Sequence, residues 1–439
     1  MPNTLNWLDI KVNYSQTLEY LFSQLPMFHR IGALAYKANL DNTIALCNSL
    51  KNPQNSFKSV HIAGTNGKGS CSHMLAAIFQ SAGYKTGLYT SPHLKDFRER
   101  IRINGEMIPE KVVTDFVENH KSNFERMQLS FFEWTVGLAF DYFANEKVDI
   151  AIIETGLGGR LDSTNIITPE LSVITNISYD HIQLLGDTLE KIAIEKAGII
   201  KPNTPVVVGE RQEKIDSVFL EKSKINKSEI TFASDYFVAE KIKNNGELQT
   251  FNVFKDAVLF LKTLEISLVG NYQQKNICTV LQAVIQLQKI GWKITEEDIR
   301  TALKNIQSMT GLMGRWQKIS DAPLTICDVG HNKAGIELIL EQLKEYKYDT
   351  LRMVIGVVND KDISGILEML PKKATYYFCK ANIPRALNET ELKLSGKTFG
   401  LIGEAYSSVK AAYEQAKTDS SINDLIFIGG STFVVAEID

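Results

Sequence analysis

Short apolar runs alternate along this chain with segments of helical periodicity. Over the first half, strands are predicted at residues 59–63, 86–90, 148–153, 171–175 and 205–209. Helices are predicted within 13–50, from 70 onward, and at 109–118 and 132–145. Apolar strands that alternate with helices are typical of a mainly parallel sheet covered on both faces. The sequence therefore predicts an α/β fold.

The second half of the chain predicts two further units. Residues 211–267 are rich in lysine and contain an Asn245-Gly246 turn between alternating runs, which predicts a small antiparallel β insert. A helix is predicted at 273–290, and new strands follow at 324–327, 352–357, 375–379 and 424–428. We expect a large domain over 1–308, with a hinge near 308–314, and a smaller Rossmann-like α/β domain over 309–439.

Composition excludes several classes of protein. The net charge of −3 provides no basic field for nucleic acid. The N-terminal residues lack a signal-peptide pattern, and no apolar run reaches the roughly 18 residues of a membrane span. The five cysteines are scattered, which favours reduced thiols. We expect a cytoplasmic monomer that binds small molecules.

One segment has the pattern of a phosphate-binding loop. It follows the strand at 59–63, opens a helix, and consists of Gly64, Thr65, Asn66, Gly67, Lys68, Gly69 and Ser70. Free N–H groups and the positive end of a helix suit a polyphosphate, and Lys68 adds a point charge. The segment is not a standard Walker A motif, because Ile62 occupies the first glycine position and the hydroxyl comes one place late. A glycine turn with a solvated lysine is the alternative.

Polar residues follow two other predicted strands. Glu154 precedes a run with three glycines in four residues, where a carboxylate can complete the shell of a nucleotide-bound Mg²⁺. His181 follows the strand at 171–175 beside Asp180, which favours a metal ligand. The alternatives are a helix-capping role for Glu154 and a structural role for His181.

Other motifs are weak on their own. Lys196 lies near a predicted helix C-terminus that Gly198 would cap, and Ser91 lies in a predicted turn. Arg315 opens the second α/β unit and could reach phosphate across a cleft. Asp328 follows the strand at 324–327, where a carboxylate can bond a ribose hydroxyl.

Together and in this order, the motifs resemble the folylpolyglutamate synthase/dihydrofolate synthase family of the Mur-ligase superfamily. The matching stretches are 64–70, 91–94, 154–165, 180–181, 195–199, 314–315 and 328–332, so the resemblance covers nearly the whole chain. It implies an ATP-dependent ligase that adds L-glutamate to dihydropteroate, to tetrahydrofolates, or to both; we expect both, through an acyl phosphate. The alternatives are a different Mur-type amino-acid ligase and a P-loop switch ATPase.

The resemblance also implies roles for residues. Catalytic roles fall on Lys68, Glu154, His181 and Lys196. ATP would contact the phosphate loop and Asn276, Arg315, Asp328 and His331. Two Mg²⁺ sites would use Ser91, Glu154, His181 and a carbamate on Lys196, and a monovalent cation such as K⁺ could assist. The pterin acid would lie near Ser130, Phe131, Phe132, Glu133, Leu161, Asp162 and Ser163, with a less secure contact at residues 37–39.

This sequence departs from the family pattern at five positions. Tyr179 replaces an aliphatic residue and Val329 a glycine, while Met313 and Lys333 replace prolines. Tyr272 stands where histidine is frequent. None of these departures removes a proposed ligand.

Overall fold

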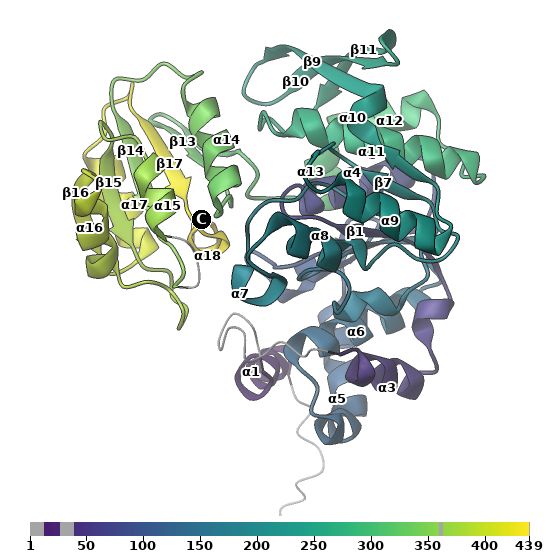
Figure 1. Cartoon of the computed structure of the whole chain (residues 1–439). Helices are drawn as coiled ribbons and strands as arrows, with labels where there is room; N and C mark the ends of the chain where they lie inside the picture. Colours follow the sequence, from purple (N-terminus) through teal and green to yellow (C-terminus); the bar gives the residue numbers. More distant parts are fainter. Residues whose placement is uncertain (1–12, 27–38, 360–362, 439) are drawn as a thin grey trace, which may run out of the picture.

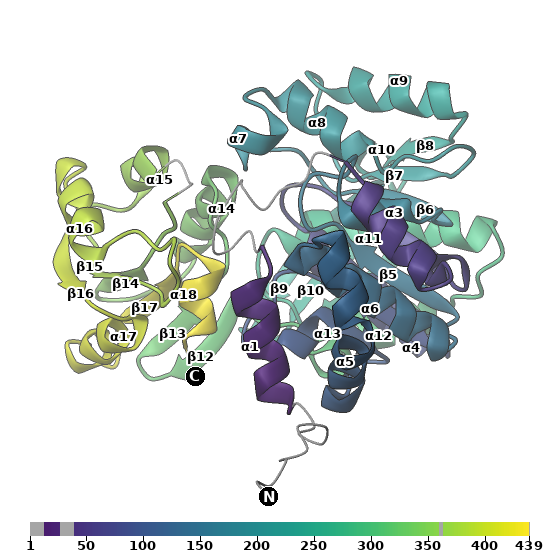
Figure 2. The same cartoon turned by 90° about the horizontal axis from the view of Figure 1, so that it is seen from below.

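The computed structural model describes residues 13–26, 39–359 and 363–438. Figures 1 and 2 show two lobes side by side, each built on its own sheet, and a third, smaller sheet lies on the larger lobe. Within those ranges no helix is both long enough and apolar enough to cross a membrane. The α/β fold with a mainly parallel sheet, an antiparallel insert and a second α/β unit is confirmed.

The large sheet has eight strands in the order β4-β3-β2-β5-β1-β6-β7-β8. Its strands from β2 to β8 along this order run parallel, and β3 and β4 add an antiparallel edge. That edge was not predicted, although its Asn104-Gly105 turn was a signal for it. The strands are β1 (Lys58–Ala63), β2 (Thr86–Tyr89), β3 (Ile101–Ile103), β4 (Glu106–Met107), β5 (Ile150–Glu154), β6 (Leu171–Ile174), β7 (Val206–Val208) and β8 (Ile230–Phe232).

Helices cover both faces of this sheet because successive strand residues point to opposite sides. Ile150 and Ile152 of β5 share a core with α4 and α11, whereas Ala151 and Ile153 pack with α5 and α6. The helices of this lobe are α1 (Tyr14–Gln24), α3 (Asp41–Ser49), α4 (Lys68–Ser81), α5 (Glu110–Met127), α6 (Phe131–Asn145), α7 (Ile182–Leu185), α8 (Leu189–Ala197), α9 (Asp216–Asn226), α10 (Ala233–Tyr236), α11 (Gln273–Lys289), α12 (Glu296–Lys304) and α13 (Ile306–Thr310). Short 3₁₀ turns lie at Pro53–Asn55, Phe97–Arg100 and Ser163–Ile166.

The antiparallel insert is narrower than the sequence predicted. It comprises β9 (Phe237–Asn244), β10 (Gln249–Lys255) and β11 (Val258–Ile266), and the turn at Asn245-Gly246 joins β9 to β10 as expected. Residues 211–236 belong instead to α9, β8 and α10, and β8 extends the large sheet. Lysine content therefore did not distinguish the antiparallel sheet from α9 and the turns beside it, which also carry lysines.

The second lobe carries a six-stranded sheet in the order β12-β13-β17-β14-β15-β16. Helices pack on both of its faces and enclose two apolar cores. The strands are β12 (Gln317–Asp321), β13 (Leu324–Cys327), β14 (Leu351–Ile355), β15 (Thr375–Cys379), β16 (Ile402–Tyr406) and β17 (Leu425–Gly429). The helices are α14 (Lys333–Leu343), α15 (Ile363–Met369), α16 (Glu389–Thr398), α17 (Val409–Thr418) and α18 (Thr432–Ala436).

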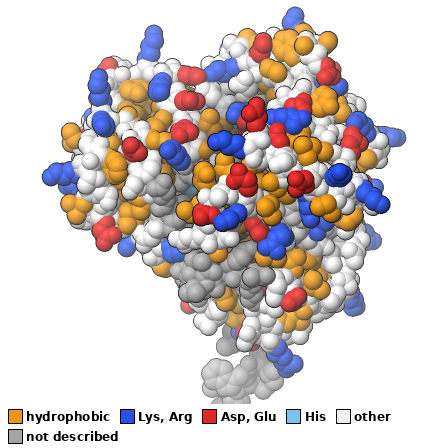
Figure 3. Space-filling view, viewed as in Figure 1, with side chains coloured by type: hydrophobic (Ala, Val, Ile, Leu, Met, Phe, Trp, Pro, Cys, Tyr) orange, Lys and Arg blue, Asp and Glu red, His pale blue; other side chains and the backbone are white. Residues whose placement is uncertain are grey.

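The surface is mixed in charge. On the face in Figure 3, acidic and basic side chains are interspersed over both lobes. This distribution agrees with the small net charge of the chain. In both cartoons α14 lies on the side of the second lobe that faces the first.

Candidate active site

The predicted phosphate loop joins the end of β1 to the start of α4. Gly64 (φ +143°) and Gly67 (φ +86°) have backbone conformations that favour glycine. A Cβ on Gly64 would overlap the Thr175 hydroxyl, and one on Gly67 would overlap the Asn276 carboxamide. Both positions therefore require glycine, and the loop leads into a helix N-terminus that suits an anion.

The loop after β6 holds the phosphate loop in place. Thr65 N–H donates to the Asn176 carbonyl at 2.8 Å, and Asn66 N–H donates to Asn176 Oδ1 at 3.1 Å. The Thr65 hydroxyl donates to the Ser178 carbonyl at 3.1 Å and accepts from Ser178 N–H at 3.0 Å. These bonds tie the phosphate loop to the segment that follows β6.

Two lysines converge on one carbonyl of this loop. Lys68 Nζ donates to Gly64 O at 3.1 Å and to Thr65 O at 3.2 Å, while Lys196 Nζ donates to Gly64 O at 2.8 Å. Lys196 is buried, and burial, aided by the charge of Lys68, lowers its pKa to about 7. A substantial fraction of Lys196 is therefore uncharged near neutral pH.

Glu154 ends β5 beside the loop. Its Oε2 accepts from Ser91 N–H at 3.3 Å, and burial raises its pKa while Lys68 and Arg315 oppose that rise. Among the residues that the structure describes, no three His, Cys, Asp or Glu side chains form a ready metal site. A buried carboxylate beside a phosphate loop nevertheless fits Mg²⁺, which takes few protein ligands and completes its shell with phosphates and water.

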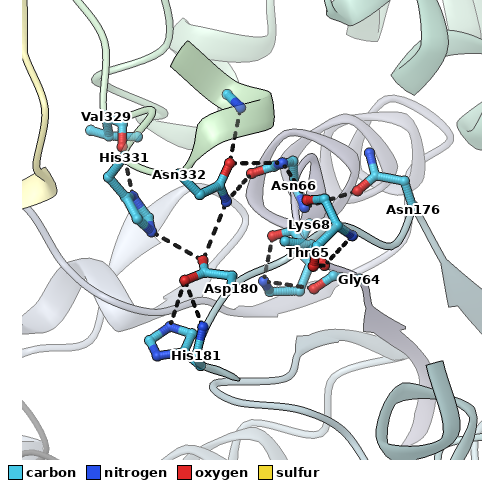
Figure 4. A network of polar contacts seen from close by, with 12 residues as sticks. Gly64, Thr65, Asn66, Lys68, Asn176, Asp180, His181, Val329, His331 and Asn332 are labelled. Atoms are coloured by element: carbon cyan, nitrogen blue, oxygen red, sulfur yellow. Dashed lines mark hydrogen bonds and ion pairs between the residues drawn. The ribbon is translucent and has the colours of Figure 1, made fainter. Parts of the chain in front are cut away.

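Asp180 joins the two lobes, as Figure 4 shows. Its Oδ2 lies 3.4 Å from His331 Nε2 and accepts from Asn332 Nδ2 at 3.3 Å, and its Oδ1 lies 3.8 Å from His181 Nε2. Asn332 and Asn66 also exchange two side-chain hydrogen bonds, at 2.9 and 3.2 Å. His181 and His331, both predicted site residues, are thus brought to the same carboxylate.

The second lobe contributes Arg315 and Asp328. Arg315 Nη2 lies 3.0 Å from where a Cβ on Gly69 would be, which places the guanidinium over the start of α4. Asp328 accepts three hydrogen bonds: from the Tyr272 hydroxyl (2.6 Å) and Trp316 N–H (2.8 Å) on Oδ2, and from Gly330 N–H (2.8 Å) on Oδ1. Burial raises its pKa, and these bonds oppose the rise.

A cavity of about 440 Å³ lies between the lobes, and all the predicted nucleotide and metal residues line it. They are Gly64, Thr65, Asn66, Gly67, Lys68, Gly69, Ser70, Ser91, Glu154, His181, Lys196, Asn276, Arg315, Asp328 and His331. Asn176, Ser178 and Asp180 also line it, although they were not among the predicted site residues. Their position directly after the strand at 171–175 was the signal that could have identified them.

The predicted pterin residues are placed differently. None of Ser130, Phe131, Phe132, Glu133, Leu161, Asp162 and Ser163 lines the cavity. Ser130 and Glu133 form a capping box on α6, with bonds of 2.6 and 3.3 Å. Asp162 Oδ2 accepts from Leu157 N–H at 2.7 Å and shapes the loop after β5.

The ring of Phe132 lies behind a residue that lines the cavity. Its Cε2 would lie 2.6 Å from a Cβ on Gly156, which lines the cavity. Phe132 therefore packs behind the wall at this point. Of the less secure contact segment, residues 37 and 38 lie outside the described residues.

Comparison with known proteins identifies the family of each lobe. Residues 62–284 match the Mur ligase middle domain, and residues 314–432 match the Mur ligase glutamate ligase domain. The folylpolyglutamate synthase of Lacticaseibacillus casei is 33% identical, over 97% of this chain and 98% of that protein. The dihydrofolate synthase/folylpolyglutamate synthase of Escherichia coli is 33% identical, over 86% of this chain and 85% of that protein.

Solved structures agree with this assignment over the whole chain. Escherichia coli FolC, solved in complex with DHPP and ADP, superposes with a TM-score of 0.82 at 28% identity, over 100% of this chain and 98% of that one. Mycobacterium tuberculosis folylpolyglutamate synthase, solved with ADP and AMPPCP, gives a TM-score of 0.84 at 30% identity, over 97% of each chain. The chain belongs to the dihydrofolate synthase/folylpolyglutamate synthase family of Mur ligases.

Proposed function

We propose that this protein uses ATP to join L-glutamate to dihydropteroate and to tetrahydrofolates. The observation that carries the proposal is the cavity between the lobes, which brings the phosphate loop, Glu154 and Arg315 to one place. The relatives named for these two activities span nearly the whole chain, which supports the substrates.

The charges around the cavity suit phosphoryl transfer. The carboxylate of the acceptor attacks the γ-phosphorus of ATP, and ADP leaves, which gives an acyl phosphate. Lys68 opens α4 and Arg315 reaches the start of this helix from the second lobe, and both would spread the charge of the transferring group. The amine of L-glutamate then attacks the acyl carbon and inorganic phosphate leaves, which forms the amide.

Mg²⁺ would be held by Glu154, Ser91 and His181, with the phosphates of ATP completing its shell. It would supply charge neutralisation at the phosphates. Burial lowers the pKa of the Lys196 amine to about 7, and a neutral amine is the form that would take up CO₂ as the carbamate expected from the resemblance, which would serve a second Mg²⁺. A monovalent cation such as K⁺ remains part of the proposal.

The acceptor site is proposed on the Phe132 side of the cavity. Phe131, Leu161 and Ser163 belong to the same proposed wall, whereas Ser130, Glu133 and Asp162 would act by holding its backbone. This division follows from their hydrogen bonds to backbone N–H groups of their own segments.

Three further points belong to the proposal. A boundary between residues 308 and 309 is supported by the two matched family regions, which lie on either side of it.

Five free, buried cysteines support a reducing, cytoplasmic location. We also propose that the protein acts as a monomer, since both sides of the cavity come from one chain.

ADP release tests the proposal. Purified protein with Mg·ATP and L-glutamate receives dihydropteroate or tetrahydrofolate in separate reactions. Release with both acids, and only when glutamate is present, is expected. Release with one acid would leave a single activity. Release that ignores glutamate would favour a switch ATPase, and release with neither acid would favour a different Mur-type ligase.

A further inference from the structure

Tyr272 connects the two lobes at the cavity wall. It lies directly before α11 of the large lobe, and its hydroxyl donates to Asp328 Oδ2 of the second lobe at 2.6 Å. Its ring lies against Gly270, where an added Cβ would be 2.7 Å from Cζ. The ring is therefore confined, and the short bond is typical of a hydroxyl that donates to a carboxylate.

Asp328 also bonds the residue that follows Arg315 in the chain. The same Oδ2 atom accepts from Trp316 N–H at 2.8 Å, and Asp328 is 3% exposed. A buried carboxylate with three donors has little freedom to shift unless one of the donors is lost.

The turn at residues 314–316 has an unusual backbone. Gly314 (φ +69°) and Trp316 (φ +48°) both lie in the left-handed region, which is rare for a bulky residue. Trp316 is 1% exposed, and its Nε1 donates to the Tyr346 hydroxyl at 3.0 Å. Such a conformation persists only when its surroundings fix it, and the bond from Trp316 N–H to Asp328 is one of the fixing contacts.

Arg315 lies between Gly314 and Trp316 in the chain, and its side chain reaches the large lobe. We propose that Tyr272 is a positioning residue, whose hydroxyl acts through Asp328 and the turn at 314–316 to hold Arg315 over the start of α4. Other bonds join the lobes near α14, including Asn271 N–H to Gln342 Oε1 at 2.7 Å and the Asn66–Asn332 pair. Loss of one hydroxyl therefore leaves the lobes docked while Arg315 loses its fixed position.

A double-mutant cycle on nucleotide binding tests this role. Calorimetry measures the affinity for Mg·AMPPCP relative to Mg·ADP in the full-length protein, for the wild type, Tyr272→Phe, Arg315→Ala and the double variant. Arg315→Ala is expected to reduce the AMPPCP preference about tenfold, and Tyr272→Phe about threefold to fivefold. The double variant is expected to resemble Arg315→Ala, because Tyr272 acts through that residue.

Two variants control the cycle. Tyr377→Phe removes a comparable hydroxyl, which donates to Asp419 at 2.9 Å within the second lobe, and should leave the preference unchanged. Tyr272→His keeps a donor and should retain most of the preference, which separates the role from a loss of folding in Tyr272→Phe. Additive effects in the double variant, or an unchanged preference in Tyr272→Phe, would overturn the proposal.

The proposal rests on the proposed function only for the identity of the phosphates. Analogue binding needs neither acceptor nor glutamate, so the two can fail separately. A coupled cycle in a protein without glutamate-dependent ADP release would retain the role of Tyr272 and reject the ligase. Glutamate-dependent ADP release together with additive effects in the cycle would retain the ligase and reject the role of Tyr272.

Discussion

The proposed phosphate side and the proposed acceptor side of the site differ in whether their polar residues line the cavity. Around the phosphate loop, Lys68, Glu154 and Arg315 line the cavity, and Lys68 Nζ also donates to two carbonyls of the loop. On the acceptor side, the polar atoms of Ser130, Glu133 and Asp162 are bonded to the backbone of their own segments. The residues predicted from the family resemblance thus line the cavity in one region and bond the backbone in the other.

The difference has a physical origin. The ends of parallel strands meet at one edge, so residues that follow them gather there whatever they bind. A capping box, by contrast, satisfies the first N–H groups of a helix, which would otherwise lack partners. The same residue types can therefore bind a ligand or cap a helix, and only the position of their hydrogen-bond partners distinguishes the two roles.

The largest loss of activity is expected from a substitution in the phosphate loop. Lys68→Ala should lower acid- and glutamate-dependent ADP release by about a thousandfold, because the loop loses its point charge beside the phosphates. Its melting temperature should stay close to that of the wild type. Lys191→Ala is the matched control, since that lysine is exposed and pairs with Asp187. Near-normal turnover in Lys68→Ala would remove the loop from the mechanism.

Glu154→Gln should reduce turnover by about a hundredfold and raise the Mg²⁺ concentration needed for half-maximal rate. The amide keeps the shape of the carboxylate but not its charge. A magnesium titration of ADP release measures both quantities. An unchanged magnesium requirement would show that the metal is held without Glu154.

Lys196 makes stability depend on pH. Its folded pKa of about 7 lies below the ordinary value of 10.5, so between these values the unfolded chain binds a proton that the folded chain lacks. The unfolding free energy should therefore rise with pH through this window, by about 1.4 kcal/mol per pH unit at most. Below pH 7 the burial penalty is fully present.

Urea unfolding of wild type and Lys196→Met in CO₂-free buffer at pH 7 and pH 9 measures this dependence. The difference between the two proteins should change by up to about 2 to 3 kcal/mol in favour of the wild type at the higher pH. Lys191→Met, at an exposed lysine, should show no such change. Parallel pH profiles for wild type and Lys196→Met would contradict the lowered pKa.

The smallest effects are expected from substitutions in the proposed acceptor wall. Glu133→Ala should cost about 1 kcal/mol of stability through loss of the cap, with little change in KM for dihydropteroate. Phe132→Ala, one residue away, should instead raise that KM, because its ring supports the cavity wall at Gly156. A raised KM in Glu133→Ala with unchanged stability would mean that Glu133 contacts the substrate directly.

Sequence reasoning predicted the strands that are apolar throughout and the residues that follow them. It missed β12 and β16, which lie at the edges of the second sheet and expose several side chains, so their pattern is weaker. It also missed the hydrogen bond from Tyr272 to Asp328, because 55 residues lie between the two and no local sequence pattern predicts such a bond. Asn332 was part of a quoted motif, yet its pairing with Asn66 depends on how the lobes dock.

The claim that the phosphate side activates a carboxylate has a direct test. The acceptor acid is labelled with ¹⁸O in its carboxylate, and the phosphate released during turnover with Mg·ATP and L-glutamate is examined by mass spectrometry. Attack by the acid on ATP predicts one ¹⁸O atom in each released phosphate. Phosphate without the label would show that water, and not the carboxylate, receives the phosphoryl group, which would contradict the account.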